Sequence, residues 1–301
     1  MTYSIVARDP DTGELGVAVQ SHWFSVGPIV PWARPGVGAV ATQAMIEVAY
    51  GPRALALLKH GVRSQEALQR LTAADPGAAG RQVAVMDAAG DVAVHTGDAA
   101  IPFAGHVVGD GVSCQANMMA SARVWPDMLD AFTAAAGSLT QRLLAALDAA
   151  EAAGGDVRGR QSAAILVVPA TGEAWETVVS LRVEDHPEPL AELRRLVGLH
   201  EAYTVAERGD ELVSQGRHVE AAEAYRQSAA LAPESEELRF WDGLGSALAG
   251  DLDAGAEQVR QVIARRSGWG ELLERLSPEI APSAAEVRFR LAEGDVRDDE
   301  L

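Results

Sequence analysis

The sequence predicts an α+β fold followed by an all-helical region. Pairs of β-favouring segments joined by short turns with Gly or Pro recur in the first part of the chain, and helical segments lie between them. Such hairpins favour antiparallel sheets over alternating strand–helix units. From Leu190 onward the sequence is rich in Ala, Glu, Leu and Arg and contains no convincing strand. Because the pattern breaks at His186-Pro-Glu-Pro189, we expect one domain over residues 1–185 and a second over 186–301.

Three hairpins are expected in the first domain. Residues 3–8 and 15–20 flank a turn with Pro10 and Gly13, which supply turn geometry. The same arrangement pairs residues 82–86 with 91–95, and residues 164–168 with 174–180. The expected first domain therefore contains antiparallel sheets built from short connections.

Two helix pairs separate the hairpins. The first pair covers residues 53–59, where Pro52 is tolerated in the first turn, and residues 64–74. The second pair covers residues 122–136 and 139–153, and the latter ends at Gly154-Gly155. This order of strands and helix pairs predicts a layered domain.

The second domain contains a degenerate sequence repeat. Gly216 and Gly250 lie 34 residues apart, and Ala221, Tyr225 and Pro233 between them match the tetratricopeptide pattern, in which small and aromatic residues let two helices pack closely. About one and a half repeats are visible, whereas roughly three form an autonomous solenoid. We therefore expect this region to be stabilised by packing against the first domain or against a second copy of the chain, as a homo-oligomer. Residues 293–301 are expected to form an acidic tail.

Composition excludes several classes of function. The chain has 25 Lys+Arg against 43 Asp+Glu, a net charge of −18, which disfavours binding to nucleic acid or anionic membranes. The acidity is concentrated in residues 186–301, with 13 basic and 24 acidic side chains. A single cysteine, Cys114, excludes an intramolecular disulfide; it could be a nucleophile, but a lone cysteine in an apolar strand is more often a small core residue. With no classical export signal and no run of about 18 apolar residues, a cytoplasmic protein is expected.

Common catalytic motifs are absent from the sequence. The seven histidines show no HxH, HExxH or HxxxH spacing, so no compact zinc site is expected. The sequence also lacks the GxxxxGK[ST] and GxSxG motifs, and we expect no cofactor and no metal.

Thr2 is the candidate nucleophile that remains. Removal of Met1 before a small residue would leave Thr2 with a free α-amine beside its own hydroxyl. Because an α-amino group has a pKa of about 7.7–8.0, it can act as general base for that hydroxyl at neutral pH. The alternative is that Thr2 is a β-branched residue that merely begins a strand.

Several sequence blocks resemble the DUF1028 family, which is grouped with the N-terminal-nucleophile (Ntn) hydrolases. The blocks lie in order over about residues 1–185: Met1-Thr-Tyr-Ser-Ile-Val-Ala-Arg-Asp9, Thr12-Gly-Glu-Leu-Gly-Val-Ala-Val19, Val30-Pro-Trp-Ala-Arg34, Gly36-Val-Gly-Ala-Val-Ala-Thr-Gln43, Tyr50-Gly-Pro-Arg53 and Gly159-Arg-Gln-Ser-Ala163. Residues from about 186 resemble the helical extension, labelled peptidoglycan-binding, of some members. The resemblance implies a four-layer αββα sandwich followed by an all-α extension.

The resemblance also implies catalytic roles. It makes Thr2 the nucleophile, and it puts Gln20-Ser21 where related enzymes carry an acid on the second strand, so Ser21 is expected at the site. No lysine matches the one that follows in those enzymes, because Lys59 lies on a helix. Residues 156–162 resemble an acid-then-serine segment, in which the Ser162 hydroxyl would orient the free amine.

Other residues are expected around the substrate. Asn117 could donate its side-chain N–H to a developing oxyanion, or could be a turn-forming residue before a helix. Arg160 and Gln161 could bind a substrate carboxylate or amide, although a solvated loop arginine is the alternative. His22 could frame the pocket or lie in the core, and Gln43, at the end of a family-like block, is expected to bind substrate.

Together these features favour a cytoplasmic amidohydrolase that cleaves a small amide C–N bond through an acyl-enzyme on Thr2. The alternative hypothesis is a catalytically silent scaffold whose helical extension binds a protein partner or mediates oligomerisation.

Overall fold

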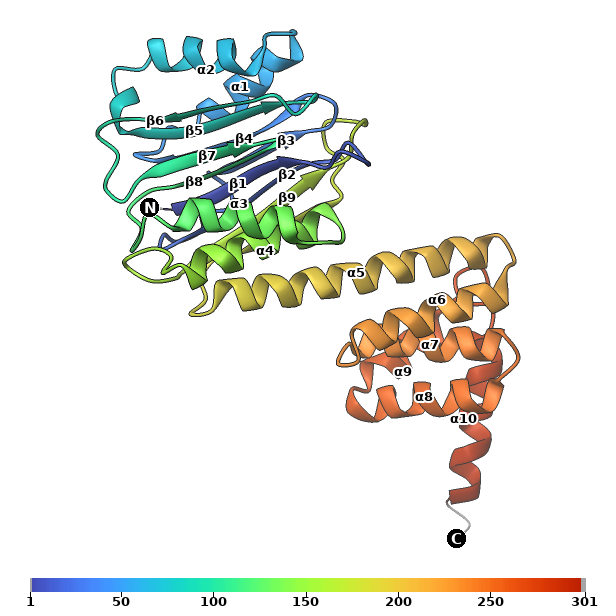
Figure 1. Ribbon diagram of the computed structural model, residues 1–301. Coiled ribbons are helices and arrows are strands. Elements are labelled where there is room, and N and C mark those ends of the chain that lie inside the picture. The colour runs from blue at the N-terminus through green and yellow to red at the C-terminus, as the bar shows by residue number, and fades with distance from the viewer. Residues whose placement is uncertain (1, 299–301) are drawn as a thin grey trace. The chain divides into compact units, whose positions relative to one another are not determined.

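The computed structural model describes residues 2–298 and has two antiparallel sheets, helices on their outer faces and a helical C-terminal region (Figure 1). The chain divides into two compact units, Met1–Leu196 and Val197–Leu301. This division lies inside helix α5 (Pro189–Ser214) rather than at residues 185 and 186. The start of α5 belongs to the first unit because Leu193 is fully buried and Arg194 forms a salt bridge with Asp148.

Two antiparallel sheets form the centre of the first unit. The six-stranded sheet has the order β10-β9-β2-β1-β8-β7. Its strands are β1 (Thr2–Arg8), β2 (Leu15–Ser21), β7 (Gly105–Gly109), β8 (Val112–Ala116), β9 (Ser162–Val168) and β10 (Val179–Val183). The four-stranded sheet has the order β3-β4-β5-β6, with β3 (Pro31–Arg34), β4 (Gly38–Ala44), β5 (Arg81–Asp87) and β6 (Val92–Thr96). The antiparallel pairing expected for β1 with β2 and for β5 with β6 is confirmed.

The third hairpin differs from the expectation at its second strand. β10 begins at Val179, where it pairs with Val167, whereas the sequence predicted a strand from residue 174. The connection carries Gly172 at a φ of +149° and Trp175 with 77 % of its surface exposed. The Val178 N–H already donates to the Val167 carbonyl at 2.8 Å, but the residues from 174 to 177 lie in a turn and loop outside the strand.

Helices cover the outer face of each sheet (Figure 1). Helices α1 (Tyr50–Lys59) and α2 (Ser64–Ala73) pack on the four-stranded sheet, and α3 (Val124–Ala134) and α4 (Leu139–Ala152) pack on the six-stranded sheet. A short 3₁₀ helix, Ala78–Gly80, precedes β5. Helix α4 begins with a reciprocal capping box between Ser138 and Gln141, which satisfies two backbone donors of its first turn.

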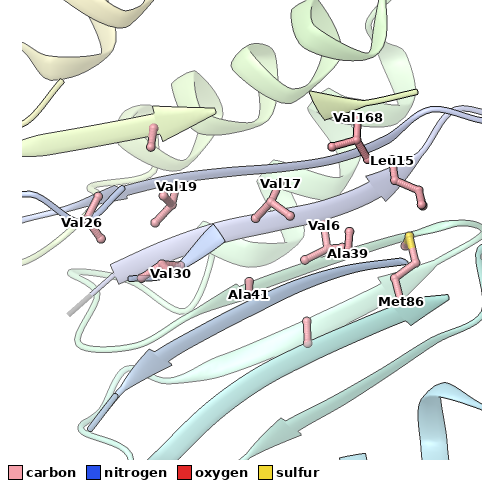
Figure 2. Close-up of a cluster of buried hydrophobic side chains, with 12 residues drawn as sticks. Val6, Leu15, Val17, Val19, Val26, Val30, Ala39, Ala41, Met86 and Val168 are labelled. Atoms are coloured by element: carbon pink, nitrogen blue, oxygen red, sulfur yellow. The ribbon is translucent and has the colours of Figure 1, made fainter. Parts of the chain in front are cut away.

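The inner faces of the two sheets pack on each other. Because side chains alternate along a strand, β1 and β2 send Val6, Val17 and Val19 into the space between the sheets, where they meet Ala41 and Met86 (Figure 2). The same alternation sends Thr2, Ser4 and Ser21 to this inner face, at the opposite end of β1 and β2 from Val6 and Leu15. The space between the sheets is therefore apolar at one end and polar at the other.

The second unit is helical. The later part of α5 is followed by α6 (His218–Leu231), α7 (Glu236–Leu248), α8 (Leu252–Arg265), α9 (Gly268–Arg275) and α10 (Ala284–Asp298). Gly216 and Gly250 have positive φ angles of 71° and 106° and connect α5 to α6 and α7 to α8. A Cβ at Gly209 or Gly245 would lie 2.6 or 2.7 Å from the Tyr225 ring, so glycine allows close helix packing there. Of the expected acidic tail, residues 293–298 continue α10, and residues 299–301 lie outside the described residues.

Candidate functional site

Thr2 lies at the start of β1, in the middle of the six-stranded sheet, and only 4 % of its surface is exposed. Its Oγ1 is 3.0 Å from the Oγ of Ser21, and these two hydroxyls share a hydrogen bond. The register explains the contact, because Thr2 pairs with Ser21 on β2 and Ser21 pairs with Ser162 on β9. Three hydroxyl residues on neighbouring strands therefore lie side by side at one end of the sheet.

A cavity of about 360 Å³ opens beside Thr2. Its polar wall comes from Thr2, Gln43 and two arginines, and most of the remaining wall is apolar. The lining residues are Thr2, Trp23, Val26, Ile29, Val30, Gln43, Ala44, Met45, Ile46, Arg81 and Arg158. The volume is at the small end of the range for small-molecule sites, which is about 300–1,000 Å³.

One wall residue has a strained backbone. Ala44, the last residue of β4, has a φ of 69°, which is the left-handed region that L residues with a Cβ rarely adopt. Such a conformation costs on the order of 1–2 kcal/mol for a non-glycine residue and is found preferentially at functional sites. The strain at Ala44 supports a functional role for this cavity.

A set of buried amides holds the carbonyl of Thr2. The Thr2 oxygen accepts hydrogen bonds from the Asn117 backbone N–H (3.1 Å), from Asn117 Nδ2 (3.3 Å) and from Gln43 Nε2 (3.3 Å). The Thr2 N–H donates in turn to the Asn117 carbonyl at 3.3 Å. The nucleophile candidate is thus fixed from both sides of its backbone.

Gln82 connects these amides into a network. Its Oε1 accepts from Gln43 Nε2 at 2.7 Å and from Asn117 Nδ2 at 2.9 Å. Ser4 Oγ donates to Gln43 Oε1, and Gln115 Nε2 donates to Ser4, each at 2.7 Å. All five side chains are buried, so the network resists rearrangement. The sequence analysis missed Gln82, although a polar residue in an apolar β-strand was a signal for it.

The amide of Asn117 is engaged inside the protein. Its Nδ2 donates to the Thr2 carbonyl and to Gln82, and Asn117 does not line the cavity. Its Oδ1 is buried without a hydrogen-bond partner among the described residues. The geometry therefore favours positioning of Thr2 over the expected contact with an oxyanion.

Ser162 shapes the cavity wall. Its Oγ donates to the Trp23 carbonyl at 2.5 Å and accepts from the Val26 N–H at 3.1 Å. Trp23 and Val26 both line the cavity. Ser162 therefore anchors the loop after β2, and its hydroxyl is bonded to that loop's backbone.

Three expected substrate-binding residues lie outside the cavity wall. Arg160 forms salt bridges with Glu151 and Glu188, and Gln161 Nε2 donates to Asp185. The His22 ring lies 3.3 Å from the Arg160 carbonyl. Of the expected substrate-binding set, Gln43 lines the cavity.

Arg158, two residues before Arg160, lies in the cavity wall. Its Nη2 and Nε donate to the two carboxylate oxygens of Asp156 at 2.8 and 3.1 Å. The Asp156 carboxylate is fully buried and also accepts from the His22 backbone N–H at 3.3 Å. In the sequence both arginines sit in one glycine-containing loop, and nothing there shows which one turns toward Thr2.

Other titratable groups fit less well into a catalytic role. Burial raises the pKa of the Cys114 thiol, so this cysteine is not poised as a thiolate nucleophile. Burial, together with the neighbouring Glu151 carboxylate, raises the pKa of the Tyr3 phenol well above its ordinary value. Among the described residues, no group of three or more His, Cys, Asp or Glu side chains could hold a metal ion. No helix in residues 2–298 is long and apolar enough to cross a membrane.

Comparison with known proteins identifies related chains. A model of the family described as a family of unknown function, DUF1028, matches residues 2–193. The crystal structure of protein SPO2555 from Silicibacter pomeroyi, described with the same family model, is similar with 34 % identity and a TM-score of 0.60. The match covers 65 % of this chain and 84 % of that one.

A weaker likeness links the chain to Anbu (ancestral beta-subunit) from Yersinia bercovieri. Identity is 15 % and the TM-score 0.33, over 65 % of this chain and 93 % of that one. A similarity this low supports no conclusion about this chain. No curated protein matches the chain.

Proposed function

Because the chain belongs to the DUF1028 family, whose function is unknown, we propose an activity from its own site: an Ntn-type amidohydrolase that uses Thr2 as nucleophile. The observation that carries the proposal is the Thr2 hydroxyl, nearly buried and hydrogen-bonded to Ser21, in the wall of a cavity of metabolite size. The two facing antiparallel sheets with outer helix pairs support an αββα Ntn-hydrolase fold.

The proposed reaction begins with removal of Met1, which frees the Thr2 α-amine. The amine takes the proton of the Thr2 hydroxyl while Oγ1 attacks the substrate carbonyl carbon. Backbone N–H groups stabilise the oxyanion, and the C–N bond breaks as the leaving amine takes up the proton. Water then hydrolyses the acyl ester, releases a carboxylic acid and restores Thr2. No cofactor enters this scheme.

The chain's own residues prepare this step. Ser21 Oγ, 3.0 Å from Thr2 Oγ1, can orient the hydroxyl from the buried side of the cavity wall. Gln43 and Asn117 hold the Thr2 carbonyl, so the nucleophile keeps one orientation toward the cavity. Positioning of this kind lowers the entropic part of the barrier.

The mass of the intact protein and its labelling by an electrophile test the proposal. We expect loss of Met1, and Thr2-dependent acylation by a β-lactone probe in wild type and in Thr2→Ser but not in Thr2→Ala. Thr133→Ala, at an exposed threonine of α3, is the matched control and should label like wild type. Retention of Met1, or equal labelling of Thr2→Ala and wild type, would contradict the mechanism.

A second candidate function is a catalytically silent scaffold whose helical unit binds a partner or a second copy. Exposed apolar side chains in that unit favour it, because Val219, Ile280 and Phe289 are each at least 64 % exposed. The close packing around Tyr225 supports a tetratricopeptide-like unit. Light scattering over a range of concentrations tests self-association, and Ile280→Glu tests whether this exposed side chain takes part in it. A protein that is monomeric at every concentration contradicts the oligomer.

A further inference from the structure

The cavity beside Thr2 has a one-sided charge distribution. Of the described residues that line it, Arg81 and Arg158 are charged, and none is a carboxylate. The acids that pair with these arginines, Asp75 and Asp156, do not line the cavity. Each arginine therefore lines the cavity, while the carboxylate that pairs with it lies outside the cavity lining.

Both arginines are fixed in place. Arg158 makes a two-point contact with the buried Asp156, and its side chain stays 30 % exposed. Arg81 Nε donates to Asp75 Oδ2 at 2.8 Å, and its Nη1 donates to the carbonyls of Met45 and Ile46 in the cavity wall. A planar guanidinium held in this way suits recognition of a carboxylate, because little side-chain entropy is left to lose.

The rest of the wall favours an apolar group. Val26 and Val30 come from the loop between β2 and β3 and belong to the buried apolar cluster between the sheets (Figure 2). Ile29 and Ile46 lie beside them, and Trp23 adds a ring that is 57 % exposed. A volume of about 360 Å³ accommodates one compact apolar group together with a small polar one.

We propose that the substrate is a small amide that carries a carboxylate, with its apolar half against Val26, Val30 and Ile46 and its carboxylate bound by Arg158 in the field of Arg81. The inference rests on the proposed function for the bond that is cleaved at Thr2, but the binding preference itself does not need catalysis. Hydrolysis adds water across the C–N bond and gives a carboxylic acid and an amine, one of which keeps the original carboxylate.

Binding to the Thr2→Ala protein tests the substrate class without turnover. N-phenylacetylglycine and N-phenylacetylglycinamide have the same apolar half and differ in the negative charge, and their affinities can be compared by calorimetry. We expect the carboxylate to bind at least about tenfold more tightly than the neutral amide, because a charge-assisted hydrogen bond is worth at least that factor. Equal affinities, or no binding of either compound at millimolar concentration, overturn the proposal.

The variant Arg158→Gln tests whether Arg158 is the source of the preference for the carboxylate ligand. Arg158→Gln in the same background should bring the two affinities to within about twofold, whereas Arg70→Gln, which removes an arginine paired with Glu66 on the surface of α2, should keep the preference. If Arg158→Gln folds poorly because Asp156 loses its partner, the ligand pair on the unchanged pocket still decides the matter. A preference that persists in well-folded Arg158→Gln overturns the role of Arg158.

The outcome is separable from that of the proposed function. Carboxylate preference without Thr2-dependent labelling supports the ligand class and contradicts the hydrolase. Thr2-dependent labelling with equal binding of the two ligands supports the hydrolase and overturns the anionic substrate.

Discussion

Replacement of Gln82 by leucine should destabilise the first unit strongly. Gln82 is fully buried on β5, and five hydrogen-bond partners lie within 3.0 Å of its amide. Its Oε1 accepts from Gln43 and Asn117, and the two N–H groups of Nε2 are shared among three acceptors, the Thr96 hydroxyl and the carbonyls of Gly105 and Ala116, at 2.7 to 3.0 Å. Leucine fills a similar volume and replaces none of these bonds.

The structure bounds the magnitude. At about 1 kcal/mol net for each of the roughly four hydrogen bonds that two lone pairs and two N–H groups can make, complete loss would cost about 4 kcal/mol. Gln43 and Asn117 keep the Thr2 carbonyl as an acceptor, and Thr96 keeps His106, so those three partners are not orphaned. We therefore expect Gln82→Leu to lower the free energy of unfolding by about 3 kcal/mol, a large part of the roughly 5–15 kcal/mol of a typical domain.

Hydrogen exchange resolved by peptide and followed in urea measures this loss in β1, β5 and β8 separately from the helical unit. Gln69→Leu, at an exposed position of α2, is the matched control and should change stability by less than about 0.5 kcal/mol. A loss below about 1 kcal/mol in Gln82→Leu would show that the amide network does not hold the sheets together as argued.

Three further outcomes are expected. Gly38→Ala should destabilise the first unit by about 1–3 kcal/mol in urea unfolding, because a Cβ there would lie 2.3 Å from the Met86 carbonyl; a neutral effect would contradict this packing. Gly198→Ala, with open space around the added methyl group in α5, should instead raise stability by up to about 1 kcal/mol. The hydrogen bond from Arg81 and the Gly77 N–H lower the pKa of Asp75 to about 2, so its stabilisation is complete above pH about 4 and is lost as pH falls toward 2. Acid unfolding of Asp75→Asn should therefore depend less on pH in that window, and an unchanged profile would refute the assignment.

Much of the fold could be predicted because its signals are local. The turn of Pro10 and Gly13 between two β-favouring segments predicted a hairpin whose antiparallel pairing is confirmed. Local signals were less reliable at β10, where residues 174–178 are β-favouring but lie in a loop. Strand formation needs a partner edge, and the path of the connection decides where that edge is reached.

The site residues likewise divide into those that local sequence features predicted and those that only the tertiary structure brings together. Thr2 was predicted from its chemistry, and its contact with Ser21 follows from the register of one hairpin. The network around Gln82 joins β1, β4, β5 and β8, and hydrogen bonds between residues so far apart leave no periodic trace in the sequence. Arg158 and Arg160 have identical side chains two residues apart in one loop, so the sequence does not show which of them lines the cavity.

Local patterns and turn residues thus specified much of the secondary structure and the antiparallel pairing, and the position and chemistry of Thr2 made it the candidate nucleophile. The packing of two sheets against each other decided which arginine faces the cavity, which amides hold Thr2 and where Asn117 points. Side-chain chemistry is a property of each residue alone, whereas burial, field and orientation arise only when distant segments exclude water from a shared space.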